Sequence, residues 1–186
     1  MAWSSPRSAC WSTALAPDRP ANPASSAAAA HSDRIRSYRA GRRLALAAIF
    51  EGEFGQRTAS AILERHLAES ESDPEAADLA RRLVAAVVEH RDTIDATIER
   101  LAPQYPVVQL ARMDRALLRC AIGEVLHSPA TPARVAIAEW VELARTYSGD
   151  SMRRLVNGVL GRIIAEAPTA PAGRSTRASR GQPRGS

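Results

Sequence analysis

Three apolar-periodic segments follow one another between Met113 and Ile164 with very little chain between them. In each segment the apolar residues recur every three or four positions, which is the spacing of one face of an α-helix. No window of the chain alternates between apolar and polar residues as a half-buried strand does. The sequence therefore predicts an all-α domain, a helical bundle of about seven helices arranged in two sub-bundles.

Local start and stop signals place the helix boundaries. Thr58 is a candidate N-cap, and Asp73 followed by Pro74 is a start signal, because the carboxylate can cap free amides and proline at the first position sacrifices no hydrogen bond. Pro103 should end the helix that starts there, and Asp114 is the expected cap of a later one. The helices are expected at about 37–54, 59–67, 74–101, 114–126, 132–147 and 150–166.

The chain of 186 residues is long enough for one domain with tails, since a single hydrophobic core commonly takes ~100–150 residues. Residues 1–33 are rich in Ser, Ala and Pro without a period, which predicts a disordered extension. Residues 34–166 should form the helical domain, and residues 167–186 a disordered, arginine-rich tail. Two cysteines, Cys10 and Cys120, do not suggest a disulfide framework, and no apolar run reaches the ~20 residues of a membrane span. These features predict a cytoplasmic protein with no membrane contact.

Charge is unevenly distributed along the chain. None of the 25 basic residues is lysine, so arginine abundance alone says little about function. The C-terminal 167–186 segment carries four arginines and no acid, whereas residues 34–166 are nearly balanced with 19 arginines and 18 acids. Within that domain, however, five arginines come before the first acid, Glu51, so one end of the domain is strongly basic. These are Arg34, Arg36, Arg39, Arg42 and Arg43.

The first expected helix combines an apolar stripe with these arginines. Leu46, Ile49, Phe50 and Phe54 define the stripe, and Arg36, Arg39, Arg42 and Arg43 lie on the same side of the helix one to three turns earlier. Burying unpaired guanidinium groups is prohibitively unfavourable, so the helix is expected to overhang the bundle, or to stay frayed, where its stripe turns basic. Exposed arginines beside Tyr38 suit phosphate contact and base stacking. The alternative is a solvated helix end in an arginine-rich proteome.

Catalytic and metal-binding patterns do not emerge from the sequence. The four histidines (His31, His66, His90, His127) are scattered, and there is no Cys-x-x-Cys, no His-Glu-x-x-His and no glycine-rich phosphate loop after a strand. We expect no enzyme activity, no metal and no cofactor. His90 is interpreted as structural, and Asn157 and Gly158 as sites of close helix packing, because both have poor helix propensity.

Three phrases of the chain resemble the NusB family of bacterial transcription antitermination factors. They are the helix opening at 114–119, the Val-Ala-Ile-x-Glu phrase at 135–139 and Val-Asn-Gly-Val-Leu at 156–160. A histidine followed by Ile-Asp in the long helix, at 90–95, also fits, and the resemblance runs from about Arg39 to Ile164. Three phrases in the family's order make a chance resemblance improbable.

The resemblance implies an RNA-binding factor that binds the boxA element of ribosomal RNA operons together with NusE, a small-subunit ribosomal protein, and helps RNA polymerase resist termination. Leu155 stands where many members have an aromatic residue. The implied partner-binding residues are Asp114, Arg115 and Leu118. The expected RNA-binding residues, from the resemblance and the basic helix together, are Arg36, Tyr38, Arg39, Arg42, Arg43, Phe50, Arg153, Arg154 and Leu155.

Other functions remain open at this stage. A NusB-like module could act in ribosomal RNA maturation, or a helical module could serve oligomerisation without RNA, and a homodimer is possible in any case. NusB-like bundles also precede the catalytic domain of ribosomal RNA cytosine methyltransferases. Such an enzyme needs a following Rossmann-like domain, for which the chain up to Ser186 leaves no room.

Overall fold

Helices account for every regular element in the computed structural model, which describes residues 23–129 and 131–166. Within these ranges there is no strand, so the predicted all-α class is confirmed. A single 3-10 turn, η1, accompanies seven α-helices. Their bounds are α1 Pro23–Gly52, α2 Ala59–Glu69, α3 Pro74–Glu89, α4 Arg91–Leu101, η1 Val107–Gln109, α5 Arg112–His127, α6 Ala133–Tyr147 and α7 Asp150–Glu166.

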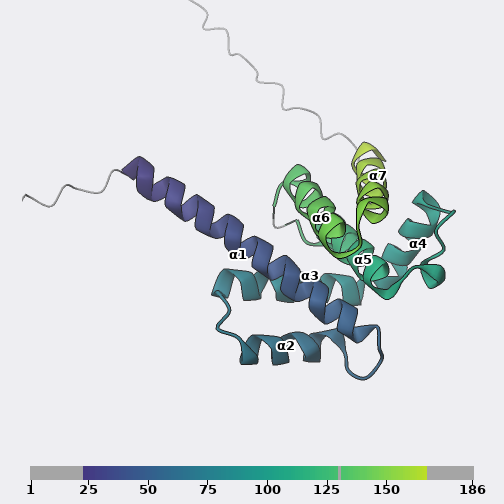
Figure 1. The fold of residues 1–186 in the computed structure, drawn as a ribbon, viewed down its shortest axis with the longest axis horizontal. Coiled ribbons are helices and arrows are strands. Elements are labelled where there is room, and N and C mark those ends of the chain that lie inside the picture. Colours follow the sequence, from purple (N-terminus) through teal and green to yellow (C-terminus); the bar gives the residue numbers. More distant parts are fainter. Residues whose placement is uncertain (1–22, 130, 167–186) are drawn as a thin grey trace, which may run out of the picture.

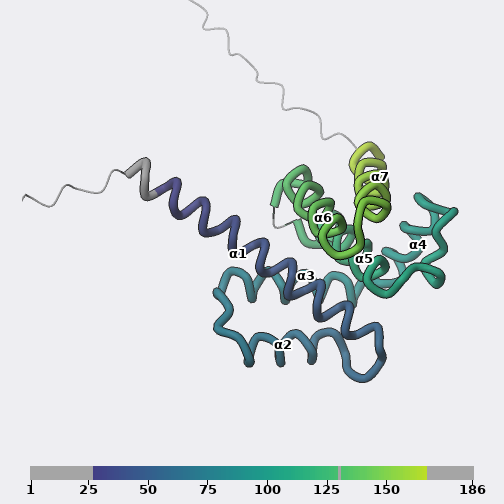
Figure 2. Tube along the Cα trace, in the orientation of Figure 1, coloured from purple at the N-terminus to yellow at the C-terminus, as the bar shows by residue number. Residues whose placement is uncertain are grey.

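The helices divide into two groups that share one core. Helices α1, α2 and α3 pack on one another, while α4, α6 and α7 gather around α5, as Figures 1 and 2 show. Helix α5 also contacts α1 and α3 and so joins the two groups. Its buried Leu117, Leu118 and Ile122 belong to the same hydrophobic cluster as Leu46 of α1 and Leu83 of α3. The predicted arrangement in two sub-bundles is therefore confirmed.

Two close helix contacts depend on glycine. A Cβ placed on Gly41 of α1 would lie 2.7 Å from the Ala76 carbonyl oxygen of α3. A Cβ on Gly123 of α5 would lie 2.9 Å from Cγ2 of Val87, also on α3. Backbone approach at these two positions brings α3 against both α1 and α5. Gly158, by contrast, is exposed with nothing within 4 Å of such a Cβ, so the expected close packing there is wrong.

Helix α1 begins 14 residues earlier than the sequence analysis placed it, at Pro23 instead of Ser37. Proline suits a first helical position, and the run of four alanines at 27–30 has high helix propensity. The expected disorder of residues 1–33 is therefore wrong for 23–33, while 1–22 and the 167–186 tail lie outside the described residues. Residues 27–36 are all exposed, and Figure 1 shows this part of α1 projecting beyond the bundle. The expected overhang is confirmed up to Arg36, but it is wrong for Arg42, which is buried in the bundle.

The single helix expected at 74–101 is two helices that meet at His90. This residue has φ −107° and ψ 19°, outside the helical region, and it ends α3 and begins α4. Its N–H still donates to the Ala86 carbonyl, and its carbonyl still accepts from the Ile94 N–H. Because the hydrogen bonds continue almost unbroken without proline or glycine, the break leaves no signal in the sequence.

Helix starts were predicted with mixed success. Thr58 caps α2 as expected, with its hydroxyl accepting from the Ala61 N–H at 3.3 Å. Asp73 directly precedes α3, but its carboxylate makes no capping hydrogen bond. The prediction that Asp114 caps α5 is wrong, because the helix begins at Arg112 and Asp114 lies inside its first turn. None of the described helices has the length and apolar character needed to cross a membrane.

Candidate nucleic-acid interface

The residues predicted to bind RNA lie on two helices, α1 and α7, which do not form one continuous surface. Helix α6 packs on α7, and its Glu139 bonds to Arg39 of α1. The next turn of α6 carries Glu142, whose pKa is lowered chiefly by a hydrogen bond from Arg145 and further by the charges of Arg153 on α7 and of Arg39. The acidic face of α6 therefore lies between the two groups of arginines.

Arg42 is buried, so the expectation that it belongs to an exposed basic cluster is wrong. Its residue is 1% exposed, and its Nε and Nη2 donate to the Glu124 carboxylate at 2.9 and 2.6 Å. Glu124, also buried, accepts from the Trp140 Nε1 at 2.7 Å, and Thr131 bonds to both charged groups. The two buried charges are tolerated because they pair with each other, while Thr131 bonds to both and the Trp140 N–H donates to the carboxylate. Arg42 holds α1 against α5 and α6.

Arg39, one turn before Arg42, remains available at the surface. Its side chain is 56% exposed and forms a two-armed contact with Glu139 at 2.8–3.0 Å. This hydrogen-bonded carboxylate raises the pKa of Arg39, so the guanidinium is charged at any physiological pH. The Glu139 side chain is 17% exposed, and an ion pair at the surface contributes at most ~1 kcal/mol. A phosphate can therefore compete with Glu139 for the guanidinium.

The other arginines of α1 keep the overhang basic. Arg34, Arg36 and Arg43 are exposed, and of these only Arg36 has an acidic partner in the described part of the chain, Asp33 at 3.0 Å. Sequence reasoning had left Arg34 out of the site. Tyr38 is half-buried against the core at the root of the overhang. Four guanidinium groups with an aromatic ring beside them thus remain as a candidate anion-binding surface.

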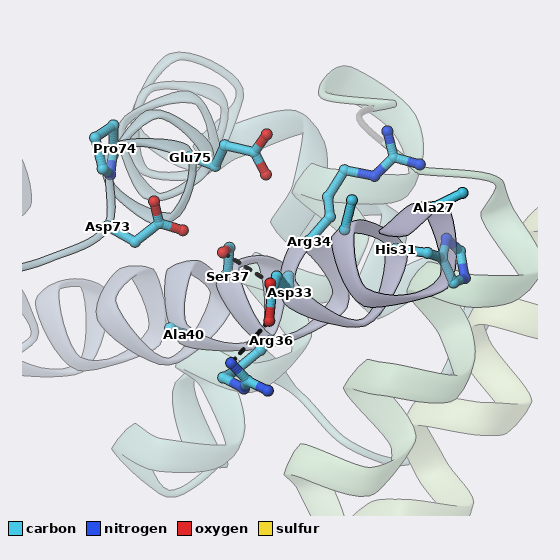
Figure 3. Close-up of a pocket in the computed structure, with 11 residues that line it drawn as sticks. Ala27, His31, Asp33, Arg34, Arg36, Ser37, Ala40, Asp73, Pro74 and Glu75 are labelled. Atoms are coloured by element: carbon cyan, nitrogen blue, oxygen red, sulfur yellow. Dashed lines mark hydrogen bonds and ion pairs between the residues drawn. The ribbon is translucent and has the colours of Figure 1, made fainter. Parts of the chain in front are cut away.

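One side of the overhang carries charges of both signs. A groove of about 1190 Å³ lies between α1 and the start of α3. Asp33, Asp73 and Glu75 bring carboxylates to it, and the guanidinium groups of Arg34 and Arg36 line it as well (Figure 3). The Ser37 hydroxyl bonds to the Asp33 backbone carbonyl on the same wall. Because like charges repel, the carboxylates reduce the attraction of this groove for a polyanion, and Arg34 and Arg36 at its edge offset part of that repulsion.

Phe50 is less accessible than a stacking platform should be. It is half-buried against the core and meets Phe54 edge to face, with ring centroids 5.4 Å apart. Phe54 is the exposed ring of the pair, and the Arg112 guanidinium lies over it at 4.5 Å. The structure therefore brings Phe50 into packing at the far end of α1 and leaves Phe54, which sequence reasoning did not select, at the surface.

Only one of the three predicted RNA-binding residues on α7 is exposed. Arg153 donates to Asp150 at 3.0 Å and is half-buried, whereas Arg154 is exposed. Leu155 is half-buried and packs against the core. Asn157 on the same helix is exposed, which contradicts the core role expected for it. These positions form a small second candidate surface at the start of α7.

The predicted partner-binding residues differ in accessibility. Asp114 is half-buried and accepts a hydrogen bond from the Ser148 hydroxyl at the end of α6. Arg115 is half-buried and donates to Glu53 at 2.7 Å. Leu118 is 0% exposed in the core between the helices, so it cannot contact a partner and its assignment is wrong. Only Asp114 and Arg115 remain candidates for a docking surface.

The fold and the surface together define a class: an all-helical binding domain with an arginine-bearing helix that projects from the bundle. No cluster of three or more His, Cys, Asp or Glu side chains placed to hold a metal occurs in residues 23–129 and 131–166. What the arrangement can do chemically is to bind anions and flat aromatic groups.

Comparison with known proteins places this domain in a family. Residues 39–165 match the NusB family. The transcription antitermination protein NusB of Dehalococcoides mccartyi is 39% identical over 127 residues, 68% of this chain and 89% of that protein. The protein of the same name from Symbiobacterium thermophilum is 40% identical over 136 residues, 69% of this chain and 89% of that protein. The chain therefore belongs to the NusB family.

Solved structures agree with this assignment. The NusB of T. maritima superposes with a TM-score of 0.64 at 34% identity, covering 70% of this chain and 92% of that one. A structure described as antitermination factors NusB and NusE in complex with dsRNA has a TM-score of 0.63, but at 21% identity its likeness concerns the fold alone. The family match begins at Arg39, so the part of α1 from Pro23 to Tyr38 precedes the shared domain.

Proposed function

We propose that this protein is an RNA-binding transcription antitermination factor that binds boxA-type leader RNA of ribosomal RNA operons together with NusE. The observation that carries the proposal is the NusB family match over residues 39–165, nearly the whole helical domain. In this role the protein acts by binding alone, in the cytoplasm, as part of an antitermination complex with RNA polymerase. A homodimer of the free protein is compatible with the same function.

The proposed RNA surface differs from the one expected from sequence. It consists of the exposed arginines of α1 with Tyr38 at their root, and of Arg154 with Leu155 on α7. Arg42 is removed from it, because its guanidinium is bonded to Glu124 inside the bundle. Phosphates would pair with the α1 guanidinium groups and take Arg39 over from Glu139, and the weakness of that exposed pair supports the exchange.

NusE is proposed to dock near Asp114 and Arg115, where α5 begins close to the end of α6. The Ser148 hydroxyl holds the Asp114 carboxylate at this surface. A carboxylate fixed in place can pair with a basic side chain of the partner without further ordering.

A gel-shift assay with leader RNA, with and without NusE, tests the proposal. We expect binding by the wild-type protein, tighter with NusE, and weaker binding by an Arg36→Ala/Arg43→Ala variant. Arg100→Ala is the matched control, since this exposed arginine lies at the end of α4, pairs with Glu166 at the end of α7, and is away from the α1 overhang. Equal affinity of the wild-type protein for leader and scrambled RNA in the presence of NusE would refute a boxA-directed role.

A further inference from the structure

A second groove lies beside Tyr38 of α1. It has a volume of about 500 Å³ and lies between α1, α3 and the end of α5. Tyr38 lines it and also belongs to the proposed RNA surface, so the two are continuous. The other side chains that matter are Arg82, Glu89, His90 and His127.

His90 and His127 line this groove. Their rings are stacked, with centroids 3.8 Å apart and planes inclined by 20°. Burial lowers the pKa of His127, and His90 lowers it further, while Glu89 acts in the opposite direction. The His127 ring is therefore neutral at pH 7 and presents an uncharged aromatic surface.

The same ring holds an unsatisfied polar atom. The Nε2 of His127 is buried and has no hydrogen-bond partner within the described chain. A buried nitrogen without a partner is unfavourable, and native structures rarely leave one unless water or a ligand completes it.

Charges of both signs lie at the groove. Arg82 and Glu89, both on α3, are exposed. It is the neighbouring Arg81, not Arg82, that pairs with Glu64 and Asp78. Ser128, just after α5, is the remaining polar side chain that faces it. A cation, a carboxylate acceptor and aromatic rings in one groove match a nucleotide better than a plain anion, because Glu89 would repel a phosphate placed beside it.

We propose that this groove binds one unstacked base of the RNA, with its ring against the His90–His127 pair and Tyr38. Arg82 contacts the phosphate of the same nucleotide, and the Glu89 carboxylate accepts from an exocyclic amino group. Bases that carry such a group are preferred over uracil, because a carboxylate can only accept. Single-stranded RNA is typically read by stacking splayed bases on aromatic side chains in this way. The inference rests on the proposed RNA-binding function.

The test is a base-deletion scan with the full chain. Each position of a boxA-containing oligonucleotide is made abasic in turn, and affinity is measured for wild type and for His127→Leu, which replaces the aromatic ring with an aliphatic side chain of similar size. We expect one position at which the abasic change weakens wild type by about 5-fold or more, the lower end of a base-stacking contribution, and weakens His127→Leu much less. His66→Leu, on α2, is the control and should show the wild-type pattern.

A second variant guards against misfolding and tests base selection. Glu89→Gln is exposed and nearly isosteric, and it should reduce the preference for an amino-bearing base over uracil at that one position. The subsite would be overturned if His127→Leu lowered the affinity by the same factor for every abasic oligonucleotide. It would also be overturned if Glu89→Gln kept the wild-type preference for an amino-bearing base over uracil. Absence of any RNA binding by wild type would instead overturn the proposed function, so the two failures are distinguishable.

Discussion

Replacing Arg42 should destabilise the whole domain and not merely weaken a surface contact. In Arg42→Met the Glu124 carboxylate would stay buried, with its side chain 1% exposed in the native structure, while losing two charge-assisted hydrogen bonds of 2.9 and 2.6 Å. Breaking a buried ion pair by removing one partner costs about 3–5 kcal/mol. Total stabilities of single domains are about 5–15 kcal/mol, so a large fraction of the folding free energy is at stake.

Urea denaturation followed by helical circular dichroism measures this effect. Arg39→Met is the matched control, because Arg39 lies one turn away with a 56% exposed side chain and should lose at most ~1 kcal/mol. The double variant Arg42→Met/Glu124→Gln removes the stranded charge while leaving an amide oxygen for the Trp140 Nε1, and should recover a substantial part of the loss. If Arg42→Met and Arg39→Met unfold at the same urea concentration, the structural role assigned to Arg42 is refuted.

Three further outcomes follow from the same surfaces. Affinity for RNA should fall with salt by ~0.7 log units per log unit for each single-strand phosphate contact, and Arg36→Ala/Arg43→Ala should flatten that slope by about one to two contacts; an unchanged slope would remove these arginines from the RNA surface. Asp114→Asn keeps an oxygen for Ser148 but removes the charge, so binding to NusE should weaken at low salt while the melting temperature stays nearly constant; equal affinities would leave Asp114 a purely structural role. Because the pKa of His127 is lowered in the folded protein, the unfolded state takes up this proton first as the pH falls. The free energy of unfolding should therefore decline as the pH falls below about 6.5, and it should decline less for His127→Gln in urea titrations from pH 7 to 5. Parallel pH profiles of the two proteins would contradict this role of His127.

Sequence reasoning succeeded where the physical cause is local. The Thr58 cap and the overhang of α1 are set by residues within a few positions of each other, and apolar periodicity was sufficient for the all-α class. Sequence reasoning failed at His90, because this single residue with non-helical dihedral angles separates α3 from α4 while the hydrogen bonds on either side persist. Leu118 was misassigned since the motif that suggests the family does not say which of its residues face the core.

The arginines of α1 mark the boundary of what a sequence pattern can decide. Arg39 and Arg42 are three positions apart and chemically identical, yet Arg39 is exposed and Arg42 is buried, at 1% exposure. The difference lies in Glu124, which is 82 positions away from Arg42 in the chain and becomes its neighbour only when α5 packs on α1. No local rule could have separated the two residues.

This separation divides the basic segment into a support and a contact surface. The buried pair fixes α1 against α5 and α6, and thereby sets the direction in which Arg36, Arg39 and Arg43 project. A variant of Arg42 that still folds should therefore bind RNA less well because the helix is misdirected, while the number of phosphates contacted, and with it the salt slope, stays nearly the same. Loss of Arg36 and Arg43 should act in the opposite way, flattening the slope without lowering stability. Affinity alone cannot distinguish a supporting arginine from a contacting one, whereas the salt slope and the unfolding free energy measured together can.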